Sequence, residues 1–222
     1  MSAENDDPPE AAPHRFNAAD ARQKAAEAAR KAEFILSRAY GLFRDPKAEW
    51  EQIRKEETNV LSILLGYVAP LAAIPHVCGL IGAFVFGNRY GVTVVRPDVN
   101  DVIATVVSYI VVVVLVFLLG ILINAVADNF DADRDDLAAQ KVSAYSMTPA
   151  FLSGIFSLWP PLWWLSLFAI AASAYLLYRG LPILMKAPED RALGYATTVM
   201  IAGLVALVIL FSVSGCVTGG GL

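Results

Sequence analysis

The sequence has little charge for its length and very little cysteine. Only 17% of its 222 residues are charged and two are cysteine, whereas soluble domains carry about 25% charged residues. Four runs, 58–88, 102–127, 142–178 and 192–222, contain no Asp, Glu, Lys or Arg and make up more than half of the chain. Such runs exclude a soluble globule, and without a contiguous basic patch the chain is not a nucleic-acid binder. They predict an integral membrane protein.

Motifs that carry chemistry are also absent. There is no Gly-x-Ser-x-Gly, no His-Glu-x-x-His, no Walker loop and no Cys/His ligand pairing, and catalysis needs titratable groups gathered in one site. We therefore predict that the chain is not an enzyme and has no catalytic residue, metal or cofactor. Asp131, Asp133 and Asp135 match the first, third and fifth positions of a calcium loop, but its glycine and final glutamate are replaced by Asp136 and Val142. A solvated acidic loop is the better interpretation.

The N-terminal part is predicted to be polar and helical. Residues 1–16 form an acidic, proline-rich tail with a disordered composition. An Ala-rich helix follows from about residue 17 to 43, and Asp45-Pro46 is typical of a cap that begins a second helix. Trp50 and Ile53 share one face of that second helix, which we expect to lie in the membrane interface, so that these two side chains contact lipid or the bundle. A solvated linker helix is the alternative. Residues 17–57 thus predict a helical arm.

The first two uncharged runs each predict one membrane helix. The first extends from about Leu61 to Phe86 and contains Pro70 and Pro75, so we expect it to be kinked or broken. The second, residues 102–127, is 26 residues long, about 39 Å at 1.5 Å per residue, and can cross about 30 Å of hydrocarbon with tilt.

The third run is too long for one helix, so we expect a hairpin. Trp159-Pro160-Pro161 divides it into two helices, and Trp163 and Trp164 lie beside the same turn, as at a membrane–water boundary. A fifth helix is expected over residues 192–214, before a flexible tail from 215 to 222. The predicted fold class is all-α: a polytopic bundle of five transmembrane helices over residues 58–214, behind a helical cytosolic N-terminal arm.

Five local strings together resemble the Yip family of multi-pass membrane proteins, and in particular its bacterial branch. They are DPKAEW (45–50), GYVAPLAAIP (66–75), KVSAYSMTPAF (141–151), YLLYRGLP (175–182) and LMKAPEDRALGY (184–195). The resemblance covers about residues 38–213 and implies five membrane helices with a cytosolic N-terminus. Eukaryotic members bind Rab-type GTPases, a partner that does not transfer to a bacterium.

The sequence departs from the family pattern in two places. The family's Phe-Gly-Gly turn after the second helix is replaced by Phe130-Asp131-Ala132, and His76 stands where a small apolar residue is usual. His76 is the only His or charged side chain in the membrane segments; we expect it to pack beside Pro75 and bond a freed carbonyl, with function as the alternative. Arg179 is expected to extend to the headgroups, where binding of anionic lipid is the alternative role.

The candidate structural or interaction residues are those of the matching strings and their neighbours. They are Trp50, Pro70, Pro75, His76, Tyr145, Pro149, Tyr175, Tyr178, Arg179, Gly180 and Pro182. We expect the tyrosines to be packing or anchoring groups near helix ends. Small residues at spacing four, such as Ala202 and Ala206, allow close helix approach, within the bundle or in a homo-oligomer.

The function that we predict is a membrane scaffold or adaptor that binds a membrane or cytosolic protein through its charged arm. The alternative is a transporter or channel for a small solute, ion or lipid, built around the Pro-interrupted first helix. The lipid bilayer is a partner in either case. Lys and Arg are concentrated in the N-terminal arm and in the segments on its side, which predicts an inner-membrane protein with its N-terminus in the cytosol and its C-terminus outside.

Overall fold

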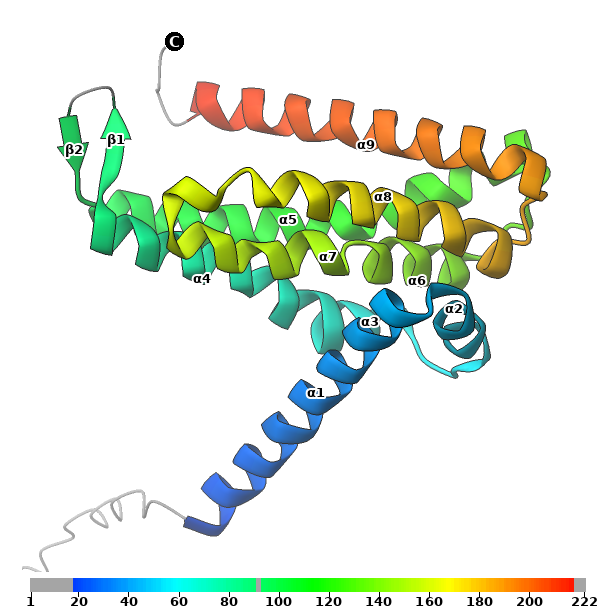
Figure 1. The fold of residues 1–222 in the computed structure, drawn as a ribbon, viewed down its shortest axis with the longest axis horizontal. Helices are drawn as coiled ribbons and strands as arrows, with labels where there is room; N and C mark the ends of the chain where they lie inside the picture. The colour runs from blue at the N-terminus through cyan, green and yellow to red at the C-terminus, as the bar shows by residue number, and fades with distance from the viewer. Residues whose placement is uncertain (1–17, 91–92, 218–222) are drawn as a thin grey trace, which may run out of the picture. The chain divides into compact units, whose positions relative to one another are not determined.

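The computed structural model describes residues 18–90 and 93–217, which are mainly helical, with one short β-hairpin (Figure 1). The helices are α1 (Ala18–Arg44), α2 (Pro46–Lys55), α3 (Val60–Ile63), α4 (Ala69–Phe86), α5 (Val99–Val126), α6 (Asp136–Ser146), α7 (Thr148–Leu152), α8 (Leu165–Leu184) and α9 (Glu189–Val217). Strands β1 (Asn88–Tyr90) and β2 (Thr93–Val95) pair antiparallel between α4 and α5. The tail predicted over residues 1–16, and the C-terminal tail beyond residue 217, lie outside the described residues.

The chain divides into two units, with the boundary inside α1 between Leu36 and Ser37. In the first unit nearly every described side chain from Arg22 to Leu36 is exposed, and Glu27 pairs with Lys31 one turn later at 2.9 Å. The predicted helix over residues 17–43 is confirmed by α1. This part of the chain is a polar, solvent-facing helix.

The first membrane segment is a continuous helix and is not broken. It runs from Val60 to Phe86, and a π-helical turn over Leu64–Val68 joins α3 to α4 just before Pro70. In that turn the Ala69 amide donates to the carbonyl of Leu64, five residues earlier. Because proline has no amide hydrogen to donate, such a local change of hydrogen-bond pattern accommodates it in a membrane helix.

Three helical stretches among the described residues are long and apolar enough to cross a membrane. They are Val60–Phe86, Val99–Phe130 and Leu165–Leu184. The other two predicted crossings do not add to this number: residues 142–158 are divided among α6, α7 and a 3₁₀ segment (Ser153–Leu158), and α9 includes side chains outside the described set. The structure is a multi-pass helical membrane protein, and the number five stays a prediction.

The hairpin predicted at Trp159-Pro160-Pro161 is confirmed. The 3₁₀ segments Ser153–Leu158 and Pro160–Leu162 turn the chain there, and α8 begins at Leu165. The 3₁₀ segment Ser153–Leu158, which leads into the turn, packs closely on α4: a Cβ on Gly154 would lie 2.4 Å from the Cα of Pro75. Trp159, Trp163 and Trp164 are all exposed, as expected for side chains that face lipid at a boundary.

The turn after α5 forms without the glycines of the family pattern. Asp131 ends a 3₁₀ turn in the left-handed region, with φ of 52°, a conformation that Asp and Asn tolerate better than other non-glycine residues. Its carboxylate pairs with Arg191, while Asp133 pairs with Lys186 and Asp128 with Arg134. The acidic loop and the loop between α8 and α9 therefore lie at the same end of the bundle.

Candidate functional site

Helix α2 packs on the bundle end through the face that the sequence identified. Asp45 caps it, accepting a hydrogen bond from the Ala48 amide at 3.1 Å, and Pro46 occupies its first turn, as predicted. Trp50 and Ile53 are both 0% exposed. Helix α8 covers this face, which confirms that Trp50 and Ile53 contact the bundle; the position of α2 in the membrane interface stays a prediction.

A glycine on α8 makes room for the Trp50 ring. A Cβ added to Gly180 would lie 2.9 Å from Cε2 and Cζ2 of Trp50, closer than real Cβ contacts. Tyr145 of α6 meets the same indole edge-on, with ring centroids 6.4 Å apart. Three residues selected from sequence strings far apart in the chain, Trp50, Tyr145 and Gly180, thus meet in one place.

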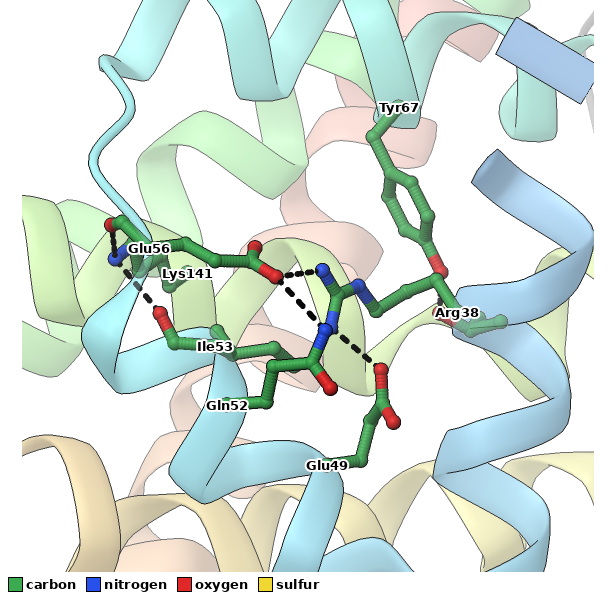
Figure 2. A network of polar contacts seen from close by, with 8 residues as sticks. Arg38, Glu49, Gln52, Ile53, Glu56, Tyr67 and Lys141 are labelled. Atoms are coloured by element: carbon green, nitrogen blue, oxygen red, sulfur yellow. Dashed lines mark hydrogen bonds and ion pairs between the residues drawn. The ribbon is translucent and has the colours of Figure 1, made fainter. Parts of the chain in front are cut away.

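A buried arginine ties α1 to α2 (Figure 2). Arg38 is 3% exposed, and its guanidinium donates to Glu49 at 2.5 Å and also to Glu56. Gly41 allows this arrangement, because a Cβ there would fall 2.0 Å from the Glu49 carboxylate. Burial disfavours the charged guanidinium, but the hydrogen bond and the charge of Glu56 outweigh it and raise the pKa of Arg38. Arg38 therefore stays charged at any physiological pH.

Lys141 of α6 binds the C-terminal end of α2. Its ammonium group donates to the carbonyls of Ile53 at 2.8 Å and Glu56 at 2.7 Å, as Figure 2 shows. The last carbonyls of a helix have no partner within the helix, and a cation there also interacts favourably with the helix dipole. We call Arg38, Glu49, Glu56 and Lys141 the Arg38 cluster; it fixes α2 at both of its ends.

An aromatic layer lies beneath the Arg38 cluster. The Arg38 guanidinium carbon is 5.5 Å from the ring centroid of Tyr145, and the ring of Tyr145 meets that of Tyr67 edge-on at 4.6 Å. The Tyr67 hydroxyl hydrogen-bonds to that of Thr148 at 2.8 Å. Because Tyr67 belongs to the first membrane segment and Tyr145 to the third uncharged run, this layer connects the arm to the membrane bundle.

The other predicted residues do not join this site. Pro149 is buried in the first turn of α7, Pro182 lies inside α8, and Tyr178 and Arg179 are half-buried. Tyr175 is exposed. Pro70, Pro75 and His76 lie in α4.

His76 packs as a structural group between α4 and α5. Its Nδ1 donates to the carbonyl of Ala72 at 2.7 Å, and its Nε2 accepts from the Ser108 hydroxyl at 3.3 Å. The expected bond to a backbone carbonyl is present, although the carbonyl that Pro75 leaves without a donor is that of Leu71, four residues before it. Tyr109 lies edge-on to the imidazole, and the three side chains His76, Thr105 and Tyr109 border an otherwise apolar cavity of about 220 Å³.

Sequence reasoning missed Arg38, Glu49, Glu56, Tyr67 and Lys141 as members of a site. Arg38 carried one usable signal: it is a single base within the apolar end of α1, FILSRAYGLF, and a charge on an apolar face needs a partner. Nothing in the sequence named its partners, since Glu49 and Glu56 are two of five acidic residues between 45 and 57. Among the described residues, no group of three or more His, Cys, Asp or Glu is placed to hold a metal ion.

The apolar helices and the buried site define a helical integral membrane protein. The Yip1 domain model matches residues 40–210, more than three-quarters of the chain, which therefore belongs to the Yip1 domain family. The chain is 29% identical over 192 residues to the inner membrane protein YohC of Escherichia coli, in strain K12 and in an O6:H1 strain, covering 84% of this chain and 98% of the relative. No solved structure matches.

Proposed function

We propose that this chain is an inner-membrane scaffold or adaptor that binds a protein partner through its N-terminal arm and performs no enzymatic reaction. The observation that carries the proposal is the contrast between the two parts of α1. Its last turns are held by the buried Arg38, whereas the side chains from Arg22 to Glu33 are all exposed and are charged, polar or small. A long exposed helix is suited to present a binding surface.

The arm can be tested in intact cells by photo-crosslinking. A benzoyl-phenylalanine at the exposed Arg30 is expected to give a discrete crosslinked protein band, and the same group at the exposed Trp163, in the hairpin, is the matched control. Arg38→Met should weaken the band by loosening the base of the arm. A band of equal strength from both positions, or none from Arg30, would contradict the adaptor role.

The cavity beside His76 is the observation that favours transport instead. Two features weigh against it: the first membrane helix is continuous through Pro70 and Pro75, and both ring nitrogens of His76 already have protein partners. Transporter sites are commonly formed by unwound helices whose backbone groups face the substrate. Reconstituted liposomes should therefore show no solute or ion flux that His76→Ala abolishes; a flux that depends on His76 would establish the transport function.

We further propose that the N-terminus is cytosolic and the C-terminus is outside. Fifteen of the seventeen Lys and Arg residues lie in the arm, the loop 128–141 and residues 179–191, and cytosolic loops are enriched in such residues. The pairs Lys186–Asp133 and Arg191–Asp131, and the bond from Lys141 to Ile53, support placing these segments at one end of the bundle.

A pair of fusions tests this topology. A C-terminal alkaline phosphatase is expected to be active and a C-terminal fluorescent protein dark, because five crossings place the two termini on opposite sides. The reverse pattern would mean that the orientation or the number of crossings is wrong. An N-terminal fluorescent fusion, expected to be bright, separates these two explanations.

A further inference from the structure

Large apolar side chains are exposed in the last turns of α1 and in the first turns of the membrane segment that follows α2. Tyr40 and Phe43 of α1 are 62% and 55% exposed, and Leu61 and Leu65, at the start of the first membrane segment, are also exposed. Tyr40 and Phe43 are three residues apart and share a face of the helix. Arg38 and Leu42, four apart, are buried on a different face of the same turns. We call Tyr40, Phe43, Leu61 and Leu65 the interfacial face.

The contacts of Arg38 set the level of these turns relative to the membrane. Figure 2 shows the Tyr67 hydroxyl directed toward Arg38, and the Tyr145 ring contacts both residues. Tyr67 is the eighth residue of the segment Val60–Phe86, about 10 Å from its start at 1.5 Å per residue. The last turns of α1 therefore lie at the level of the first turns of a membrane helix, where the boundary between hydrocarbon and headgroups is expected.

Basic side chains accompany the exposed aromatic rings. The Arg44 guanidinium donates to the Tyr40 hydroxyl at 2.8 Å and lies 5.7 Å from its ring centroid, while Lys47 is exposed just beyond. Asp45 between them is engaged as the cap of α2. Tyrosine rings at the headgroup level, with Arg and Lys extending toward phosphates, are the usual anchors of a membrane interface.

We propose that the cytosolic lipid leaflet covers the interfacial face, with Tyr40 and Phe43 at the acyl boundary and Arg44 and Lys47 against anionic lipid headgroups. The lipid-facing surface of Leu61 and Leu65 would then continue onto α1. The last turns of α1 would then meet the bundle on one side and lipid on another. This proposal does not depend on the identity or existence of a protein partner.

Spin-label accessibility of the full chain in vesicles tests the proposal. In a Cys78→Ala, Cys216→Ala background, single cysteines at Tyr40 and Phe43 are labelled and compared with Leu61 as the lipid reference and exposed Lys55 as the aqueous reference. The ratio of oxygen to nickel-chelate collisions at 40 and 43 is expected to resemble that at 61 and to exceed that at 55 severalfold. A ratio like that at 55 would overturn the proposal.

Two further measurements distinguish the remaining outcomes. Shielding of position 43 from both reagents, with dipolar broadening between labels, would show a second copy on this face and would also overturn the proposal. Adding phosphatidylglycerol to phosphatidylcholine vesicles should raise the ratio at 43 in the otherwise wild-type chain but not in Arg44→Gln, Lys47→Gln. An equal response in both chains would remove the headgroup contact from the proposal.

Discussion

Arg38→Met is expected to lower the free energy of unfolding of the membrane domain by about 3 kcal/mol and to release α2 from the bundle. Removing one partner of a buried ion pair costs roughly 3–5 kcal/mol, because the remaining charge is left without compensation. Glu49 and Glu56 are buried less than Arg38, so water can solvate them and the lower end applies. Denaturant titration in mild detergent, followed by circular dichroism, measures the loss, and protease cleavage within residues 45–57 should increase.

Two comparisons isolate the pair from a general effect of the substitution. Arg54→Met removes the exposed pair with Glu51, which has a distance of 2.6 Å but solvent-exposed side chains, and should change stability by less than about 1 kcal/mol. Adding Glu49→Gln and Glu56→Gln to Arg38→Met should restore part of the lost stability, because neither carboxylate is then left without the arginine that neutralised it. If Arg38→Met and Arg54→Met cost the same, the Arg38 cluster does not hold α2.

Local signals in the sequence located the helix boundaries well, because caps and prolines act over a few residues. Helix α2 begins at Asp45-Pro46, and the turn of the helical hairpin lies at Trp159-Pro160-Pro161, as predicted. The effect of Pro70 was not predictable in the same way. A proline in a membrane helix can break it or be absorbed by a neighbouring turn, and here the π-helical residues Leu64–Val68 absorb it.

Periodicity identified which face of α2 is apolar but not what covers it. The spacing of Trp50 and Ile53 is the same whether their face contacts lipid or protein. The space that Gly180 leaves for the Trp50 ring lies 130 residues later in the chain, and it is this space that allows α8 to cover the face. The same limit applies to Arg38, whose partners lie in α2 and directly after it and whose ring neighbour belongs to α6. A single sequence shows that such a charge needs partners, but the choice among the available acids depends on tertiary contacts.

The fit of Trp50 against Gly180 gives the second large effect. Trp50→Ala is expected to cost about 3–5 kcal/mol, since it empties a fully buried indole site. Gly180→Ala adds one methyl group at 2.9 Å from the indole, and overpacking of this kind costs about 1–3 kcal/mol. Alanine favours a helix over glycine by only roughly 0.5–1 kcal/mol, so the steric cost should dominate and Gly180→Ala should be destabilising in the same denaturant titration.

Gly66→Ala is the matched control, because a Cβ at Gly66 would meet no heavy atom within 4 Å. With no steric cost, this variant should be neutral or slightly stabilising. The smaller ring of Trp50→Phe should make Gly180→Ala less costly than it is beside tryptophan, since the two substitutions act on one contact and their effects should not add. Simple additivity of Trp50→Phe and Gly180→Ala would mean that the two residues are not in contact, and that α2 is held against α8 by Ile53 and the Arg38 cluster alone.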